Sequence, residues 1–185
     1  RLVIATNRND VLHRVLTSGV YGRQALEASL SPSMDITVSS NFERLMFDLY
    51  DRDGKAIFDL MQAFNQGDIS LTDKALQEAQ ALFASHRVSD EETCAEIARV
   101  WERCGYLLDP HSAIGTRAAQ MCQHDSSAPM VTLATAHPAK FPAAIAQSGV
   151  ATEAALPAHL HDLFQREERF TVLDNDLVQV QQHMA

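Results

Sequence analysis

Polar side chains follow the first apolar run of the chain and could take part in chemistry. Residues 2–6 predict a short buried strand, and Thr6, Asn7 and Asn9 stand at its end. In open α/β sheets, ligands bind outside the carboxyl ends of the strands. These residues are therefore a first candidate site, although strand ends of this kind occur in every α/β protein.

A second polar corner presents Thr135, His137 and Lys140. It follows residues 130–134, which form the run most typical of a strand, and Pro138 opens the next predicted helix. A helix start carries free N–H groups and partial positive charge, which suit an anion. This corner is the second candidate site.

The sequence shows no other familiar catalytic or metal-binding pattern. It has no glycine-rich phosphate loop, no nucleophile elbow and no His/Cys/Asp cluster with ligand spacing. Cys94, Cys104 and Cys122 lack metal-site spacing, and so sparse a set suits a reducing cytoplasm. His159 and His161 lie two residues apart on a predicted helix and face different ways. We therefore predict no metal site and a cytoplasmic protein.

Composition narrows the classes of partner. The net charge is −9 without a basic cluster, which argues against nucleic acid and membrane surfaces. No apolar run approaches the roughly 20 residues needed to span a bilayer. The chain opens on an apolar run without an initiator Met, so we expect a piece of a longer protein. Exposed strand edges in such a piece would favour self-association.

The predicted elements place both corners in an α/β fold with few, mostly parallel strands. Further short strands are predicted over 36–39 and 170–173, and loops over 29–35 and 125–129. Helices are predicted over 11–17 (ended by Gly19), after Ser40 (with Glu43 at the capping-box position), from Ser89 (with Glu92), from Asp109-Pro110 to 122, over 138–149, over 156–166 and after Asp174. Residues 55–108 read as entirely helical.

Six segments, in order, resemble the threonine synthase family in its yeast and bacterial form. They are Ile4–Asp10 (IATNRND), Leu30–Ile36 (LSPSMDI), Ser39–Leu45 (SSNFERL), Val88–Thr93 (VSDEET), Leu108–Gly115 (LDPHSAIG) and Thr135–Phe141 (TAHPAKF). The resemblance fades after Phe141. It implies the C-terminal part of a fold-type-II pyridoxal-phosphate enzyme that converts O-phospho-L-homoserine and water to L-threonine and phosphate.

The resemblance also implies roles for particular residues. The threonine of the TAHPAKF string, Thr135, is expected to hydrogen-bond the pyridine nitrogen of the cofactor. Asn41 and Arg44 are expected near the substrate phosphate or carboxylate. His137 and Lys140 flank the cofactor corner and are also expected to bind the substrate. The family's Schiff-base lysine lies in its N-terminal half, so no catalytic residue is expected in this chain.

The same reasoning divides the chain and leaves alternatives open. Residues 1–50 and 109–150 are expected to belong to the large cofactor domain, 51–108 to a helical insertion and 151–185 to a helical tail. Asp109 and His111 are most simply explained by helix capping. A threonine-synthase-like phospho-lyase and a non-catalytic binding module remain alternatives to a threonine synthase whose isolated C-terminal piece is inactive.

Overall fold

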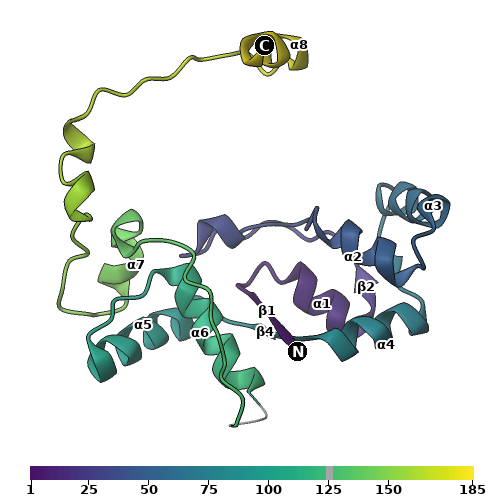
Figure 1. Ribbon diagram of the computed structural model, residues 1–185, viewed down its shortest axis with the longest axis horizontal. Coiled ribbons are helices and arrows are strands. Elements are labelled where there is room, and N and C mark those ends of the chain that lie inside the picture. The colour runs from purple at the N-terminus through teal and green to yellow at the C-terminus, as the bar shows by residue number, and fades with distance from the viewer. Residues whose placement is uncertain (124–126) are drawn as a thin grey trace. The chain divides into compact units, whose positions relative to one another are not determined.

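The computed structural model describes residues 1–123 and 127–185 (Figure 1). Contacts between residues divide the chain into two compact units, Arg1–Ala154 and Ala155–Ala185. The first unit carries both strand pairs and the larger helices. Both candidate corners therefore belong to the first unit.

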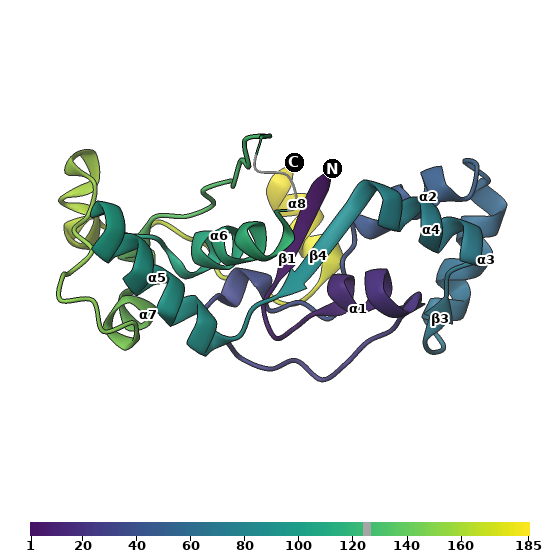
Figure 2. The same cartoon turned by 90° about the horizontal axis from the view of Figure 1, so that it is seen from below.

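A pair of parallel strands forms the centre of the first unit. Strand β1 (Leu2–Thr6) pairs with β4 (Phe83–Arg87) in a register that runs from Leu2 opposite Phe83 to Thr6 opposite Arg87. Figure 2 shows the two strands side by side. Because the pair is parallel, both polar strand ends lie at the same edge.

Helices cover both faces of this pair. Ile4 packs into a core with buried residues of helix α1 (Val11–Ser18), which include Val11 and Val15. Val3 and Ala5 face the other way, against Ile114 and Ala118 of α6 (Pro110–Cys122). The alternation along β1 follows from the two-residue period of a strand.

The larger core lies among the elements between the two strands. These are β2 (Val20–Tyr21), α2 (Phe42–Leu49), α3 (Gly54–Phe64), β3 (Ile69–Ser70) and α4 (Asp73–Leu82). β2 and β3 pair antiparallel. The ring of Tyr21 is stacked on Phe64 at 4.4 Å between centroids. Its hydroxyl donates to the Ser39 carbonyl and accepts from the Ser39 N–H, so a buried polar atom is satisfied.

Three helix boundaries of the first unit follow the sequence signals. Ser89 and Glu92 form a complete capping box at the start of α5 (Asp90–Cys104). Asp109 caps α6 by accepting from two backbone N–H groups of its first turn, ahead of Pro110. Gly19 ends α1 in the left-handed region. These predictions are confirmed.

The prediction that residues 55–108 are entirely helical is wrong. β4 lies inside this segment and supplies one of the two central strands, while β3 adds a short second strand. Its sequence, FASHR, has neither the alternation of a half-buried strand nor the apolar run of a fully buried one, so no local pattern indicates it. Whether residues 51–108 form an insertion with its own boundaries stays a prediction, as do the other proposed domain limits.

The run at residues 130–134 is not a strand in the described part of the chain. A strand is defined by its ladder partner, and these residues pair with none of the described strands. Val131 and Leu133 are 77% and 76% exposed. The strand predicted over 36–39 is also absent, because the Ser39 backbone groups bond to the Tyr21 hydroxyl instead.

Several helix predictions need correction. Asn41, in a helical conformation, precedes α2, so Ser40 makes no capping box. The helix expected over 138–149 breaks into a 3₁₀ turn, Pro138–Lys140, and α7 (Pro142–Gln147). Phe141 leaves the helical region because it precedes a proline.

In the second unit, the predicted helix over 156–166 is replaced by two 3₁₀ turns, Ala158–Leu160 and Leu163–Gln165. No strand forms over 170–173. Asp176, rather than Asp174, caps the last helix, α8 (Leu177–Met184). The loop predicted over 125–129 lies partly outside the described residues.

The fold class is confirmed: the chain is α/β, with few strands, and its longer strand pair is parallel. Among the described residues, no helix is long and apolar enough to cross a membrane. The same part of the chain shows no cluster of three or more metal-binding side chains.

Candidate functional site

A cavity of about 810 Å³ lies in the first unit, between β1, α6 and the segment that leads to the second polar corner. Its walls are mainly apolar. The polar side chains that line it come from Arg1, Ser33, His111, Thr132 and Thr135. A cavity of this size and character, with a few placed polar groups, is typical of a small-molecule site.

Thr135 stands at this cavity and is held there through its backbone. Its N–H donates to Ser112 Oγ at 3.1 Å. Its side chain is exposed, and within the described residues its hydroxyl makes no hydrogen bond. The hydroxyl is therefore free to bond a ligand in the cavity.

The start of α6 holds a buried polar network behind Thr135. Asp109 Oδ1 accepts from His111 N and from His111 Nδ1, each at 2.9 Å. Asp109 Oδ2 accepts from Ser112 N at 3.3 Å and from Ser112 Oγ. All three side chains are buried, and Asp109 is only 1% exposed. The carboxylate thus does more than cap the helix.

His111 connects this network to two other segments. Its Nε2 accepts from the N–H of Ser33, at 3.2 Å. Since Nε2 accepts, Nδ1 is the nitrogen that donates toward Asp109. Its face lies 4.6 Å from the Phe141 ring, between centroids. Both ring nitrogens are occupied, so His111 shapes the cavity wall.

His137 and Lys140 lie on the same corner but do not line the cavity. His137 is exposed, and its Nδ1 accepts from the N–H of Ala139 at 3.2 Å, which caps the following 3₁₀ turn. The Lys140 ammonium lies 5.8 Å from the centre of the Phe141 ring. The structure therefore brings these two residues to the corner, with their side chains directed elsewhere.

Asn41 and Arg44 lie at the start of α2, away from the cavity lining. Both are exposed. In the described part of the chain, the Arg44 guanidinium makes no ion pair, and Asn41 makes no side-chain capping bond. Their side chains are available to a ligand, but the structure does not group them with Thr135.

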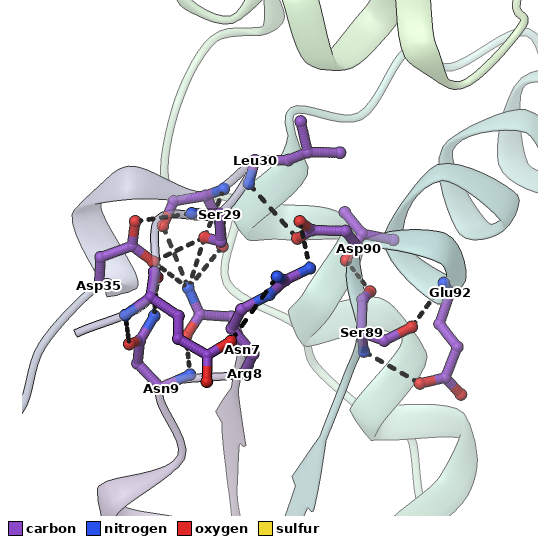
Figure 3. A network of polar contacts seen from close by, with 12 residues as sticks. Asn7, Arg8, Asn9, Ser29, Leu30, Asp35, Ser89, Asp90 and Glu92 are labelled. Atoms are coloured by element: carbon purple, nitrogen blue, oxygen red, sulfur yellow. Dashed lines mark hydrogen bonds and ion pairs between the residues drawn. The ribbon is translucent and has the colours of Figure 1, made fainter. Parts of the chain in front are cut away.

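The first polar corner is a closed network at the end of β1 (Figure 3). Asn7 is 1% exposed, and its amide lies within hydrogen-bond distance of Ser29 Oγ (2.8 Å), Ser31 Oγ (2.9 Å) and Asp35 Oδ1 (2.7 Å). Asn9 also donates to Asp35, at 2.8 Å. These bonds fix the 27–35 loop against the strand end and leave Asn7 no group for a ligand.

The same network joins the two parallel strand ends. Arg8 Nη2 lies 2.7 Å from Asp90 Oδ2, at the start of α5 beyond β4. Asp90 Oδ1 accepts from the N–H of Leu30 at 3.3 Å. Figure 3 shows Arg8, Leu30 and Asp90 meeting in this way. The first corner therefore shapes the sheet edge, and the hydroxyl of Thr6 is buried there without a partner in the described residues.

Several titratable side chains have pKa values displaced from their ordinary values. Partial burial lowers the pKa of His13; the Asp10 carboxylate opposes this shift, and His86 and Arg87 add smaller lowering effects. The Ser89 N–H, which donates to the Glu92 carboxylate, lowers the pKa of that side chain. Burial raises the pKa of the Cys94 and Cys122 thiols, and all three cysteines are free.

Sequence reasoning missed Ser112, as well as Arg1, Ser33 and Thr132 of the cavity lining. Asp109 and His111 are predicted as capping residues, and capping is one part of what Asp109 does. The available signal was a run of polar side chains at the cap and in the first turn of one helix. That run could not reveal its partners, because Ser33 and Thr135 are 78 and 23 residues distant in the chain.

Comparison with known proteins identifies sequences that are similar to this chain. A family model described as "Threonine synthase, C-terminal" matches residues 112–184. The threonine synthase of Pseudomonas aeruginosa is 57% identical over 182 residues, which cover 98% of this chain and 39% of the relative. The chain thus spans about two fifths of that relative's length.

Two solved structures that are similar to this chain are also threonine synthases. A pyridoxal-phosphate-bound threonine synthase from Brucella melitensis superposes with a TM-score of 0.90 at 48% identity, over 99% of this chain and 39% of its own. The yeast threonine synthase gives a TM-score of 0.85 at 33% identity, over 100% of this chain and 41% of its own.

Fold and cavity together define an α/β protein with a cavity suited to a small molecule between β1, α6 and the segment that leads to Thr135. The chain belongs to the threonine synthase family, and its sequence corresponds to the C-terminal part of these proteins.

Proposed function

We propose that this chain is part of a threonine synthase, which uses pyridoxal phosphate to convert O-phospho-L-homoserine and water to L-threonine and phosphate. The observation that carries the proposal is the position of Thr135 in the lining of a cavity, with a hydroxyl that makes no hydrogen bond within the described residues, in a chain with the fold of a pyridoxal-phosphate-bound relative. The phosphate ester and its reaction are inferred from the family.

The residues present fit one side of the cofactor. The cavity is large enough for a substituted pyridine ring, and Met34, Val131 and Leu133 give it apolar walls. Thr135 supplies a neutral hydroxyl, which can donate to a pyridine nitrogen without requiring that the nitrogen be protonated. Bound there, pyridoxal phosphate would supply the electron sink for proton removal at carbon.

The chain's own contribution is orientation. Thr135 would hold the ring nitrogen, while the apolar side chains of the walls would contact the ring faces. We further propose that Asn41 and Arg44 meet the substrate phosphate or carboxylate, since an exposed guanidinium fork suits either anion. His137 and Lys140 would act from the rim of the corner, because neither lines the cavity.

The covalent lysine is proposed to lie elsewhere in the longer polypeptide. This chain has Lys55, Lys74 and Lys140, all exposed, and none lines the cavity. Lys55 pairs with Asp59, and Lys74 with Asp51. We therefore propose that the isolated chain is inactive and that the activity, in the cytoplasm, requires the N-terminal part found in the relatives.

The test joins this chain to the N-terminal part of the Pseudomonas aeruginosa relative. The purified joined protein is given pyridoxal phosphate and O-phospho-L-homoserine, and phosphate and threonine are quantified. Equal amounts of both are expected, with neither product from this chain alone. Phosphate without threonine would favour the phospho-lyase, and absence of both from a folded, cofactor-loaded protein would favour a binding module.

A second experiment examines the missing lysine directly. The isolated chain is mixed with pyridoxal phosphate, reduced with borohydride and weighed intact. We expect no stoichiometric adduct, because the three lysines lie outside the cavity. A single adduct at one defined lysine would show that this chain carries its own cofactor lysine, contrary to the proposal.

A further inference from the structure

The buried network at the start of α6 extends well beyond a helix cap. A capping aspartate needs only to accept backbone N–H groups of the first turn. Asp109 also accepts from the side chains of Ser112 and His111. Each of these two side chains then contacts a distant segment, so the carboxylate lies at the centre of a branched relay.

One branch leads to the backbone of the cofactor corner. The Ser112 hydroxyl donates its hydrogen bond to Asp109, which leaves the lone pairs of the Ser112 oxygen available to another donor. That donor is the N–H of Thr135, at 3.1 Å. Within the described residues this is the one hydrogen bond made by Thr135, and it comes from a side chain that is 3% exposed.

The other branch holds the far end of the same corner. His111 donates Nδ1–H to Asp109 and turns its ring toward Phe141. Its Nε2 accepts from the Ser33 N–H, which fixes the ring in place. Thr135 and Phe141 mark the two ends of the 135–141 corner, so both ends are docked to one buried carboxylate.

We infer that Asp109, Ser112 and His111 are positioning residues that set the Thr135 hydroxyl at the cofactor ring. None of the three is proposed to touch the reacting atoms, since their polar atoms are already paired. The inference rests on the proposed function for the identity of the ligand. The relay itself is present in the chain without any ligand and can be tested separately.

Amide hydrogen exchange of the isolated, cofactor-free chain tests the relay. The Thr135 amide should exchange more slowly than the Leu133 amide, although both residues are exposed, and Ser112→Ala should speed Thr135 exchange roughly tenfold. Ser112→Thr, which keeps a hydroxyl, should restore slow exchange. Equal exchange of Thr135 and Leu133 in the unsubstituted chain would overturn the inference, whatever the variants do.

A pair of aspartate substitutions separates positioning from capping. Asp53 caps α3 by accepting from Lys55 N and Ala56 N, as Asp109 does for α6. Asparagine remains a good cap but has a single acceptor oxygen. Asp109→Asn should therefore speed Thr135 exchange, while Asp53→Asn should not. If the Thr135 amide exchanges at an unchanged rate in Asp109→Asn, Asp109 acts only as a helix cap and the inference is wrong.

In the joined protein, Ser112→Ala should weaken pyridoxal phosphate binding roughly threefold to tenfold. This affinity is measured by absorbance titration. Ser112→Thr should recover most of the affinity. If the unsubstituted joined protein binds the cofactor but is inactive, the proposed function fails while the relay stands. If it is active and Ser112→Ala binds and turns over normally, the relay fails while the function stands.

Discussion

At the scale of single residues, His13 is a side chain whose protonation opposes folding. It lies on α1 with Nδ1 2.9 Å from Ser85 Oγ, against β4. Partial burial lowers its pKa below the ordinary value of 6.5. In the folded chain His13 is therefore neutral at a pH where the unfolded chain already binds a proton.

This difference predicts how stability depends on pH. The unfolded state binds more protons between the lowered folded pKa and about 6.5, so the free energy of unfolding should fall as the pH drops through that window. Below the folded pKa the dependence on His13 should vanish. Urea unfolding from about pH 7.5 to about pH 5 would show a shallower loss in His13→Gln than in the unsubstituted chain. Parallel curves would contradict the assignment, and His183→Gln is an exposed control.

The family resemblance predicted part of the candidate site. It predicts that Thr135 contacts the cofactor, and the structure places Thr135 at a cavity with a hydroxyl that makes no hydrogen bond within the described residues. The cofactor contact itself stays a prediction. The roles of Asn41, Arg44, His137 and Lys140 stay predictions. Ser112 could not be predicted, since a hydroxyl in the first turn of a helix has meaning only once its tertiary partner is known.

At the scale of elements, local signals predicted helix ends better than strands. The caps at Ser89 and Asp109 and the helix end at Gly19 depend on neighbouring residues only, so the local sequence predicts them. Strand formation depends on a partner from elsewhere in the chain. β4 was therefore missed, and residues 130–134 were assigned to a strand that the described chain does not pair.

Two helix-ending glycines give an element-scale prediction. Gly19 and Gly105 both have positive φ, of 77° and 67°. An added Cβ at Gly19 would lie 3.1 Å from Leu76 Cδ2, whereas at Gly105 it would meet nothing within 4 Å. Either alanine should cost about 1–2 kcal/mol from left-handed strain. Gly19→Ala should cost more, because Leu76 on α4 must also move.

Denaturant unfolding of both variants is the measurement. Gly105→Ala acts as the matched control, because it carries the backbone strain without the contact. Equal losses of stability would mean that the α1–α4 packing accommodates a methyl group freely. A smaller loss at Gly19 would contradict the packing described here.

At the scale of the whole molecule, the unpaired apolar segment beside the cavity predicts association. Val131 and Leu133 are largely exposed, and β1 pairs with β4 alone in the described chain. Unpaired edges and exposed apolar side chains favour intermolecular contact. We expect the isolated chain to form concentration-dependent dimers or larger species in light scattering.

A charge on the segment should suppress this association. Val131→Lys combined with Leu133→Lys should shift the scattering toward monomer, because burying a lysine in such a contact is unfavourable. Val172→Lys, at a residue that is 82% exposed in the other unit, is the control and should have little effect. A sharp monomer peak at every concentration in the unsubstituted chain would contradict the prediction.

The central claim is that the cavity beside Thr135 is the pyridine side of a cofactor site. It is tested most directly by titrating three forms of the joined protein with pyridoxal phosphate: the unsubstituted protein, Thr135→Val and Thr135→Ser. Loss of one hydrogen bond predicts about threefold to tenfold weaker binding and lower turnover for Thr135→Val. Thr135→Ser should keep the cofactor affinity and turnover of the unsubstituted protein. Thr17→Val, on α1, is the control and should keep both as well. Normal affinity and turnover in Thr135→Val would contradict the claim.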